Sequence, residues 1–425
     1  MPRRSGSLFL FSVRRAVAVV VAAGLALYTV EGLLGVDRIQ RWRLPSGFDR
    51  RTRLEVLADL RQKGVAAIPH PSSHGYLRDR GDGTFVSQFA SEGREFLPLG
   101  GVRGRTAVVC NENGQYLIVQ PDRYGFNNPP SVWEMPSVAV AAVGDSFTYG
   151  ICVDPAESYI GRIRKAHPAT INLGITSNGP LFELATLKEY LPALKPRLVL
   201  WFFFENDIED IEFERRDALL MRYVREASFT QNLRDRQADI DRLVTQFLAD
   251  RETKARQQLA DDARFTRRTR DFLEATRLRA LIRDTRQYMF GEPDAKGLPE
   301  NDWRLFDEIL GEADRTVRSW GGRIHFVYLP TLRRFGVPVG VRLTMLPKDY
   351  MDALHTRVLD VARRHGFPIT DLTATFMNHP NARRDLFSPI FHYTAEGYRL
   401  VADAVLADMP PETTGSVTRS HDDTR

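Results

Sequence analysis

The stretch 138–150, VAVAAVGDSFTYG, restricts the fold of this chain more than any other segment. Its first six residues are small or β-branched and apolar, which is typical of a strand buried on both faces of a parallel sheet. Ser146 follows at the end of this strand, at the carboxyl edge of the sheet, where open α/β folds place their reactive groups. For the three residues Gly-Asp-Ser alone, a turn in which Asp and Ser bond their own backbone is the structural alternative.

Beyond Ser146, segments with strand character alternate with single helical segments. Strands joined by one helix imply right-handed crossovers and therefore a parallel sheet whose carboxyl ends share one edge. Thr148 stands where the G-x-S-x-G nucleophile elbow needs glycine, which excludes an α/β-hydrolase elbow. We therefore predict an α/β domain over residues 138–408, interrupted by a charged helical insertion at 210–290. The expected strands span 138–143, 170–173, 197–203, 323–329 and 368–372.

Two of the expected strand ends carry polar residues that belong at the same edge as Ser146. The loop 172–180, NLGITSNGP, contains Gly174 and Ser177 and is suited to presenting backbone N–H groups to an anion. Asn206 follows the strand RLVLWFF, and an amide there is suited to donate to a developing oxyanion, typically worth about 3 kcal/mol of barrier lowering. Helix capping is the structural alternative for each of these residues taken singly.

His392 lies in the segment 388–409, SPIFHYTAEGYRLVADAVLADM, just before an expected C-terminal amphipathic helix. A loop histidine ahead of a docking helix can be presented to a serine far away in sequence, as a general base requires. Asp145 and Asp207 adjoin Ser146 and the second strand end, and we assign them a supporting role.

The N-terminus has the pattern of a membrane anchor. Arg3, Arg4, Arg14 and Arg15 precede a nearly continuous apolar segment at 16–36. About 20 apolar residues span a bilayer core, and positive charge before them predicts a cytoplasmic tail and an exported remainder. A cleaved signal peptide is the alternative, but small-x-small patterns open this segment or lie inside it rather than following it. We expect an uncleaved anchor in a bacterial inner membrane, with the remainder in the periplasm.

Residues 37–137 are expected to form a connector and a small β addition. Short apolar runs at 106–110 and 116–120 flank Asn111–Gly114, a strong hairpin signal because Asn-Gly tolerates positive φ. We interpret this hairpin as a plain structural edge. The polar tail at 409–425 is expected to be disordered.

Composition excludes several classes of function. The net charge of +5 and pI near 9.2 come from arginines scattered through helical segments, which argues against a nucleic-acid partner. Cys110 and Cys152 have no CxxC spacing, so a structural zinc site is not expected; one disulfide or two buried thiols remain open. No nucleotide or metal-ligand motif is present, so we expect no cofactor. The insertion at 210–290 is interpreted as solvated helices, with a lid or a protein-docking surface as the alternative.

Taken together, these features resemble the SGNH/GDSL hydrolase superfamily. Ser146 in GDSF matches its nucleophile, Asn206 its N-D block and His392, in HYTAEG, its histidine. The resemblance implies a flavodoxin-like three-layer α/β/α sandwich and attack by Ser146 on an ester carbonyl with proton transfer through His392. It also implies an oxyanion hole built from the Ser146 N–H, a backbone N–H of the second block and the Asn206 amide. Ser177 and Gly174 are the candidates for that second-block N–H.

Two positions depart from the family pattern. Ser177 stands where much of the family has a glycine, five residues after the second-block asparagine, and a serine N–H serves if its φ allows. Pro389 stands where many members carry an aspartate three residues before His392. Either Asp385, Ser388 or a backbone carbonyl orients the histidine, or a Ser-His dyad acts alone.

Our hypothesis is therefore a membrane-anchored periplasmic serine esterase or O-acyltransferase acting on acyl esters, with cell-surface carbohydrate as the favoured substrate class. The substrate class rests on family analogy and location. A non-catalytic scaffold of an envelope polysaccharide machinery is the alternative from another class, and the missing aspartate favours it slightly. A lipid esterase or thioesterase is the third possibility.

Overall fold

The structure is a computed structural model of the 425-residue chain that describes residues 47–263, 299–335 and 348–410, with Leu27, Tyr28 and isolated residues between 270 and 279. Contacts divide the chain into two units, and the larger comprises Arg51–Asp250 and Asp294–Arg425. Within the described residues, no helix has both the length and the apolar character needed to cross a bilayer. The predicted anchor, except Leu27 and Tyr28, and the predicted tail beyond Pro410 lie outside the described residues.

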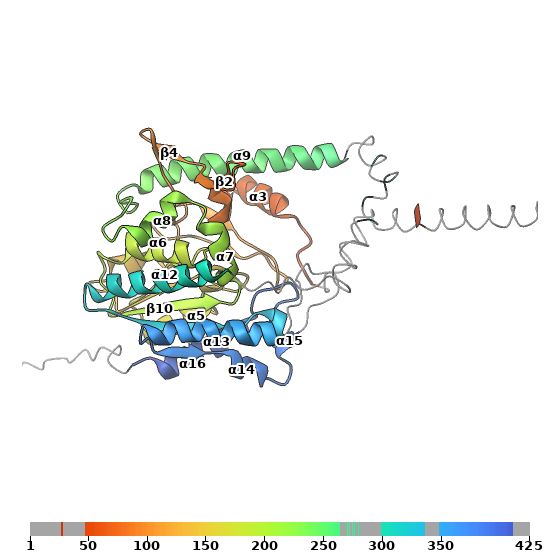
Figure 1. The fold of residues 1–425 in the computed structure, drawn as a ribbon. Helices are drawn as coiled ribbons and strands as arrows, with labels where there is room; N and C mark the ends of the chain where they lie inside the picture. The colour runs from red at the N-terminus through yellow and green to blue at the C-terminus, as the bar shows by residue number, and fades with distance from the viewer. Residues whose placement is uncertain are drawn as a thin grey trace, which may run out of the picture. The chain divides into compact units, whose positions relative to one another are not determined.

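A five-stranded parallel sheet lies at the centre of the larger unit, with the strand order β12-β11-β10-β8-β9. Figure 1 labels its middle strand, β10, among the helices of the domain. All seven residues of β10, LVLWFFF, are buried, as expected for a strand covered on both faces. The predicted α/β domain with a parallel sheet is therefore confirmed. The strands are β8 (Val140–Val143), β9 (Thr170–Asn172), β10 (Leu198–Phe204), β11 (Arg323–Leu329) and β12 (Ile369–Asp371).

Helices cover both faces of this sheet and make three layers. Alternate residues of β10 point to opposite faces, so Trp201 packs in one apolar core and Phe202 in the other. The first core includes α6 (Pro180–Tyr190), α12 (Glu300–Arg318) and α13 (Lys348–Arg364), and the second includes α5 (Tyr159–Ala166), α14 (Thr373–Met377) and α16 (Ala395–Asp408).

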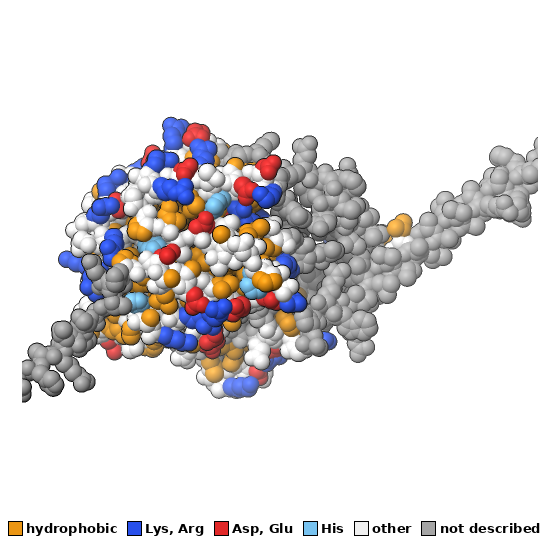
Figure 2. All heavy atoms as spheres, turned by 90° about the horizontal axis from the view of Figure 1, so that it is seen from below, with side chains coloured by type: hydrophobic (Ala, Val, Ile, Leu, Met, Phe, Trp, Pro, Cys, Tyr) orange, Lys and Arg blue, Asp and Glu red, His pale blue; other side chains and the backbone are white. Residues whose placement is uncertain are grey.

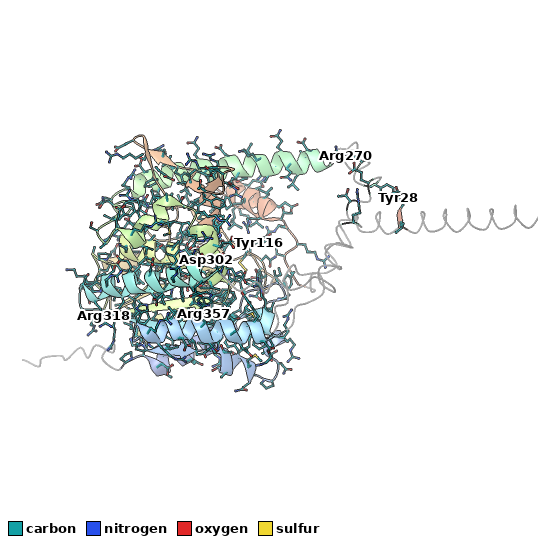
Figure 3. All side chains as sticks on the ribbon, viewed as in Figure 1. Tyr28, Tyr116, Arg270, Asp302, Arg318 and Arg357 are labelled. Carbon is teal, nitrogen blue, oxygen red and sulfur yellow. A yellow bond between two sulfur atoms is a disulfide. The ribbon has the colours of Figure 1, made fainter. Side chains whose placement is uncertain are left out.

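Side-chain contacts join neighbouring helices within one layer. The guanidinium of Arg357 on α13 lies 4.4 Å from the ring centroid of Trp303 on α12, next to Asp302, and both Arg357 and Asp302 are marked in Figure 3. On the face seen in Figure 2, basic and acidic side chains of the described residues are interspersed.

The N-terminal part of the larger unit is made of short elements. The predicted hairpin is present, with β6 pairing antiparallel to β7, although its strands are shorter than expected. Tyr116, labelled in Figure 3, donates its hydroxyl hydrogen to the Arg51 carbonyl at 2.9 Å. The elements are α3 (Arg53–Gln62), β1 (Ala67–Pro69), η1 (His74–Tyr76), β2 (Leu77–Asp79), β3 (Phe85–Ser87), β4 (Ala90–Ser91), β5 (Arg94–Glu95), β6 (Thr106–Val108), β7 (Ile118–Val119) and η2 (Pro130–Glu134).

Helices make up most of the described part of the predicted insertion. It follows β10 as α7 (Asp207–Glu214), α8 (Ala218–Arg225) and α9 (Gln237–Ala263). One side of α8 is buried, with Leu220 and Tyr223 in the same core as α6. This first part of the insertion is therefore packed into the domain, and most of the remainder, from residue 264 on, lies outside the described residues.

Candidate active site

The Gly-Asp-Ser turn joins β8 to the short helix α4 (Ser146–Tyr149). A Cβ on Gly144 would lie 2.0 Å from Thr148 Oγ1, so only glycine fits at this turn. Asp145 Oδ1 accepts a hydrogen bond from the Phe147 N–H at 2.8 Å, which caps α4. Asp145 therefore bonds its local backbone, as a turn at this motif predicts. The Ser146 hydroxyl has a partner that is far away in the sequence.

That partner is His392, 246 residues further along the chain. Ser146 Oγ lies 3.0 Å from His392 Nε2, and the Asp145 carboxylate is a second neighbour, with its Oδ2 3.3 Å from Ser146 Oγ. Ser146 is only 7% exposed, so this hydroxyl sits in a nearly closed environment. The structure thus brings together the two residues that the resemblance pairs.

The turn 388–392 and the start of α16 position the histidine. The Ser388 N–H donates to the His392 carbonyl at 2.6 Å, and Thr394 caps α16 by accepting from the Gly397 N–H. The Phe147 ring centroid lies 4.8 Å from that of His392. The imidazole is therefore held by a tight turn on one side and packed against an aromatic ring on the other.

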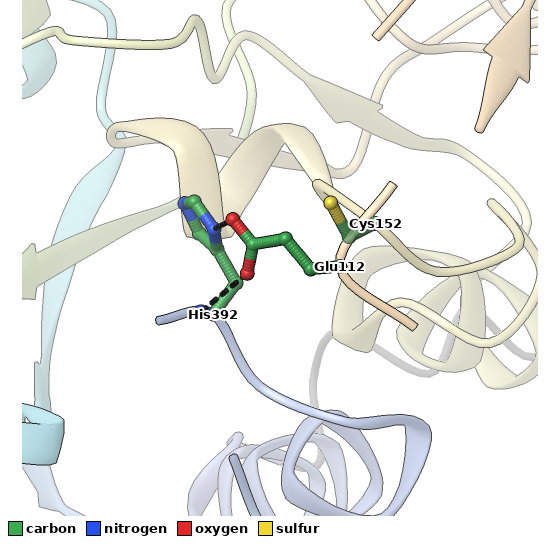
Figure 4. Close-up of side chains that lie close together, drawn as sticks. All are labelled: Glu112, Cys152 and His392. Carbon is green, nitrogen blue, oxygen red and sulfur yellow. Dashed lines mark hydrogen bonds and ion pairs between the residues drawn. The ribbon is translucent and has the colours of Figure 1, made fainter. Parts of the chain in front are cut away.

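The Nδ1 atom of His392 contacts Glu112, a residue that our sequence reasoning did not identify. The distance from Nδ1 to Glu112 Oε1 is 2.8 Å, and Oε2 accepts from the His392 N–H at 2.9 Å (Figure 4). Oε2 also accepts from Ser388 Oγ at 2.7 Å. An ionised carboxylate only accepts, so Nδ1 carries the proton and Nε2 is free to accept from Ser146. The hairpin that carries Glu112 is therefore not a plain structural edge.

Asp385 does not have the supporting role predicted for it. Its carboxylate pairs with the neighbouring Arg384, with Arg384 Nε 2.7 Å from Asp385 Oδ1. Only its backbone serves the site, because the Asp385 carbonyl accepts a hydrogen bond from Thr394 Oγ1. Ser388, the other candidate, bonds Glu112 rather than the imidazole.

Electrostatics keep Glu112 ionised although it is largely buried. Burial alone would raise its pKa, but the His392 ring and the hydrogen bonds from His392 and Ser388 outweigh burial and hold the pKa at about 2. By contrast, burial raises the pKa of Asp145 to about 6 against its hydrogen bond from Phe147 and the charge of His392. The carboxylate beside the histidine is thus the more acidic of the two.

Cys152 lies near Glu112 and His392, and the ligand atoms of the three residues lie within 4.8 Å of one another (Figure 4). The Cys152 sulfur, however, is joined to Cys110 in a disulfide. A disulfide sulfur offers no thiolate for a metal, and the Nδ1 atom of His392 already faces Glu112. The cluster therefore does not have the donor set of a metal site, and the open question about the two cysteines is answered by a bond between them.

The loop after β9 lies against the nucleophile turn. A Cβ on Gly174 would lie 2.5 Å from the Tyr149 nitrogen, so glycine permits this close approach. The Gly174 N–H donates to Asn172 Oδ1 at 2.8 Å, which removes it as a candidate oxyanion donor. Ser177 adopts φ +67°, the left-handed conformation that glycine favours, and among the described residues no acceptor bonds its N–H or that of Ser146.

Asn206 precedes α7 at the N-cap position but does not cap the helix through its side chain. Its Nδ2 lies 3.5 Å from Asp210 Oδ2, a long contact that leaves the amide hydrogens largely free. Asp207 Oδ2 accepts from the Phe204 N–H at 2.7 Å and so fixes the end of β10. Burial raises the pKa of Asp207 well above its ordinary value and that of Asp210 to about 8.

The N-terminal segment also forms hydrogen bonds with the loop that carries Ser177. Ser73 Oγ donates to the Ser177 carbonyl at 2.7 Å, and the Ser73 N–H donates to the Thr176 carbonyl at 3.1 Å. Ser72 Oγ donates to Ser177 Oγ at 2.9 Å, and His70 Nε2 lies 2.7 Å from Thr176 Oγ1. Residues 70–73 therefore hold the unusual backbone of Ser177 from outside the sheet.

A comparison with protein families agrees with this geometry. Residues 142–400, more than half of the chain, match the GDSL-like Lipase/Acylhydrolase family. The chain belongs to this family. This GDSL hydrolase is thus a member of a serine hydrolase family, and the match contains Ser146, Asn206 and His392 but not Glu112. A search of curated proteins finds no match.

The chain is also similar to solved structures, with TM-scores of 0.34 to 0.35 for three of them. TesA is 11% identical to this GDSL hydrolase, with a TM-score of 0.35, over 64% of this chain and 98% of its own. The lipase/acylhydrolase from Enterococcus faecalis is 14% identical, with a TM-score of 0.34, over 64% and 94%. The acetyl xylan esterase AlAXEase is 11% identical, with a TM-score of 0.35, over 64% and 100%. Likeness at this level carries no argument about substrate.

Proposed function

We propose that this chain is a serine esterase or O-acyltransferase in which Ser146 is the nucleophile and His392 the general base. The observation that carries the proposal is the 3.0 Å separation of Ser146 Oγ from His392 Nε2, within the reach that proton transfer requires. Ser146 Oγ attacks the ester carbonyl carbon while its proton passes to Nε2, and the imidazolium then protonates the departing alkoxide. Water or a sugar hydroxyl resolves the acyl-enzyme through the same histidine.

The developing oxyanion needs donors that the protein has not already used. The N–H groups of Ser146 and Ser177 meet this requirement, and the Asn206 Nδ2 makes only one long contact, to Asp210, whereas the Gly174 N–H is already bonded. Fixed donors of this kind lower the barrier because they need no reorganisation as charge develops. The three donors come from the nucleophile turn, the loop after β9 and the end of β10.

For the location, we propose a single-pass anchor at 16–36 in a bacterial inner membrane, with the catalytic domain in the periplasm. The arginines before the apolar segment support this orientation. The Cys110–Cys152 disulfide supports an oxidising compartment. Acyl esters of cell-surface carbohydrate are the favoured substrates on the basis of this location. A docking partner at the helical insertion is part of the same proposal.

The test uses the full chain purified in detergent, with p-nitrophenyl acetate as substrate and a fluorophosphonate probe. We expect hydrolysis and a single covalent adduct in the wild type, and neither in Ser146→Ala. Labelling that persists in Ser146→Ala would overturn the assignment of the nucleophile. Rates that rise steeply along an acetate, butyrate and palmitate ester series would replace the carbohydrate ester with a lipid ester.

A further inference from the structure

Glu112 comes from a part of the chain that the family match does not include. The match begins at residue 142, and Glu112 lies in the turn between β6 and β7. Antiparallel bonds close this hairpin on both sides of the turn, from the Val109 N–H to the Leu117 carbonyl at 2.9 Å and from the Leu117 N–H to the Cys110 carbonyl at 2.8 Å. The hairpin thus presents Glu112 as a defined structure rather than as a loose loop.

We propose that Glu112 is the positioning residue of His392 and that the Cys110–Cys152 disulfide holds it in place. The inference rests on the proposed function. Both carboxylate oxygens are used: Oε1 accepts from the imidazole, and Oε2 accepts from the His392 N–H and the Ser388 hydroxyl. One side chain therefore fixes both the ring and the backbone of the histidine. Many members of the family carry an aspartate at the position of Pro389. In this chain Glu112 makes the contact with the histidine instead.

The residues on both sides of Glu112 are attached to Cys152. Cys110 is bonded to it through the disulfide, and Asn113 Nδ2 donates to the Cys152 carbonyl at 2.9 Å. Cys152 itself follows the helix that starts at Ser146. The two attachments therefore tie the turn that carries the carboxylate to the segment that carries the nucleophile.

The proton count is the same as in a serine triad. The Ser146 proton moves to Nε2, Nδ1 keeps its proton throughout, and Glu112 remains a carboxylate that stabilises the imidazolium. Its pKa of about 2, lowered by the His392 ring and hydrogen bonds against the effect of burial, keeps it ionised over the range of any practical assay. No proton is transferred to Glu112 at any step.

The first experiment compares wild type, Glu112→Gln and Glu112→Asp by the pH profile of kcat/KM for p-nitrophenyl acetate. We expect Glu112→Gln to lower kcat about 10³- to 10⁴-fold with little change in KM, and Glu112→Asp to recover part of the loss. The acidic limb of the Glu112→Gln profile should move to lower pH, because the imidazolium loses its neighbouring negative charge. A merely structural role would lower activity without moving this limb.

The matched control is Glu134→Gln, which alters an exposed glutamate of the same segment that pairs with Arg123 at the surface. It should retain wild-type activity and profile. A Glu112→Gln variant that keeps kcat within tenfold of wild type and has an unmoved profile overturns the inference while the proposed function stands. A wild type that the fluorophosphonate probe does not label overturns the proposed function itself.

The second experiment addresses the disulfide in the same assay. We expect the double variant Cys110→Ser/Cys152→Ser to lose 10- to 100-fold in kcat, and Asn113→Ala, which keeps the disulfide, to lose less than tenfold, with near-UV circular dichroism reporting on the fold. Wild-type kcat in the double variant overturns the role of the disulfide. If the double variant unfolds, an unchanged kcat in wild type whose Cys110–Cys152 disulfide has been reduced with dithiothreitol overturns it instead.

Discussion

The α/β domain and the N-terminal segment build different parts of the candidate site from different kinds of structure. In the domain, β10 and β11 each run for seven mostly buried residues, whereas in the fully described segment 51–135 no strand exceeds three. The domain provides Ser146, Asn206 and His392. The segment provides Glu112 and the serines that hold Ser177. A regular sheet sets the positions of the reacting groups, and irregular structure outside it sets their orientation.

The contribution of the domain to transition-state stabilisation can be tested at Asn206. We expect Asn206→Ala to lower kcat by about 10²- to 10³-fold, because it removes an amide donor to the oxyanion while leaving the strand intact. The measurement is steady-state kinetics with p-nitrophenyl acetate. Asn301→Ala, which changes an exposed asparagine on α12, is the control and should be unaffected. A rise in KM with kcat unchanged would mean that Asn206 contributes to substrate binding rather than to stabilisation of the oxyanion.

The ionised state of Glu112 predicts a dependence of stability on acid. Its folded pKa of about 2 lies below the ordinary value of 4.5, so its contribution is complete above pH 4.5 and is lost as pH falls toward 2. The contribution is on the order of 3 kcal/mol. Urea unfolding from pH 7 to pH 3 should therefore show the stability difference between wild type and Glu112→Gln shrinking as pH falls. A constant difference would contradict an ionised Glu112.

The hydrogen bonds from residues 70–73 to the loop that carries Ser177 predict a smaller effect on kcat. Ser73→Ala removes the hydroxyl that donates to the Ser177 carbonyl, and we expect about a tenfold fall in kcat, the equivalent of one hydrogen bond. Ser91→Ala removes a hydroxyl of the same segment that bonds Asp239 instead, and it serves as the control. An equal effect of the two substitutions would mean that residues 70–73 stabilise the segment without orienting the loop.

The smallest effect is expected at Asp385, the carboxylate that the sequence suggested as the residue orienting His392. Asp385→Asn should change kcat less than about twofold, because its side chain pairs with Arg384 at the surface and such pairs contribute little. A loss as large as that predicted for Glu112→Gln would reverse the assignment and return the positioning role to the C-terminal region.

Local sequence pattern was sufficient for the sheet. The runs that became β8 and β10 are short and entirely apolar, which favours strands buried on both faces. The hairpin at 106–120 was also predictable, because Asn-Gly turn chemistry acts over a few residues. Because Ser146 and Asn206 both follow strands of a parallel sheet, their position at one edge was predictable, whereas the backbone N–H groups that remain free were not.

The remaining parts of the site depend on tertiary contacts that leave no local signal. Glu112 lies 280 residues from His392 in the sequence, and nothing in a turn reading Asn-Glu-Asn-Gly separates a catalytic carboxylate from a solvated one. Gly174 was excluded by the side chain of Asn172, and Asp385 by an adjacent arginine. The one available hint was Cys110, two residues before Glu112, because a disulfide to Cys152 fixes the turn beside the nucleophile.

The most direct test of the account is the proton on His392 Nδ1, observed by NMR on full-length protein carrying ¹⁵N-labelled histidine. A hydrogen bond from Nδ1 to a carboxylate strongly deshields this proton. We predict a downfield resonance of this kind in the wild type, beside those of other histidines near carboxylates such as His355 and His365, that is lost in Glu112→Gln and in His392→Ala and retained in Asp385→Asn. Persistence of this resonance in Glu112→Gln, or its loss in Asp385→Asn instead, would contradict the claim that the N-terminal segment completes the site.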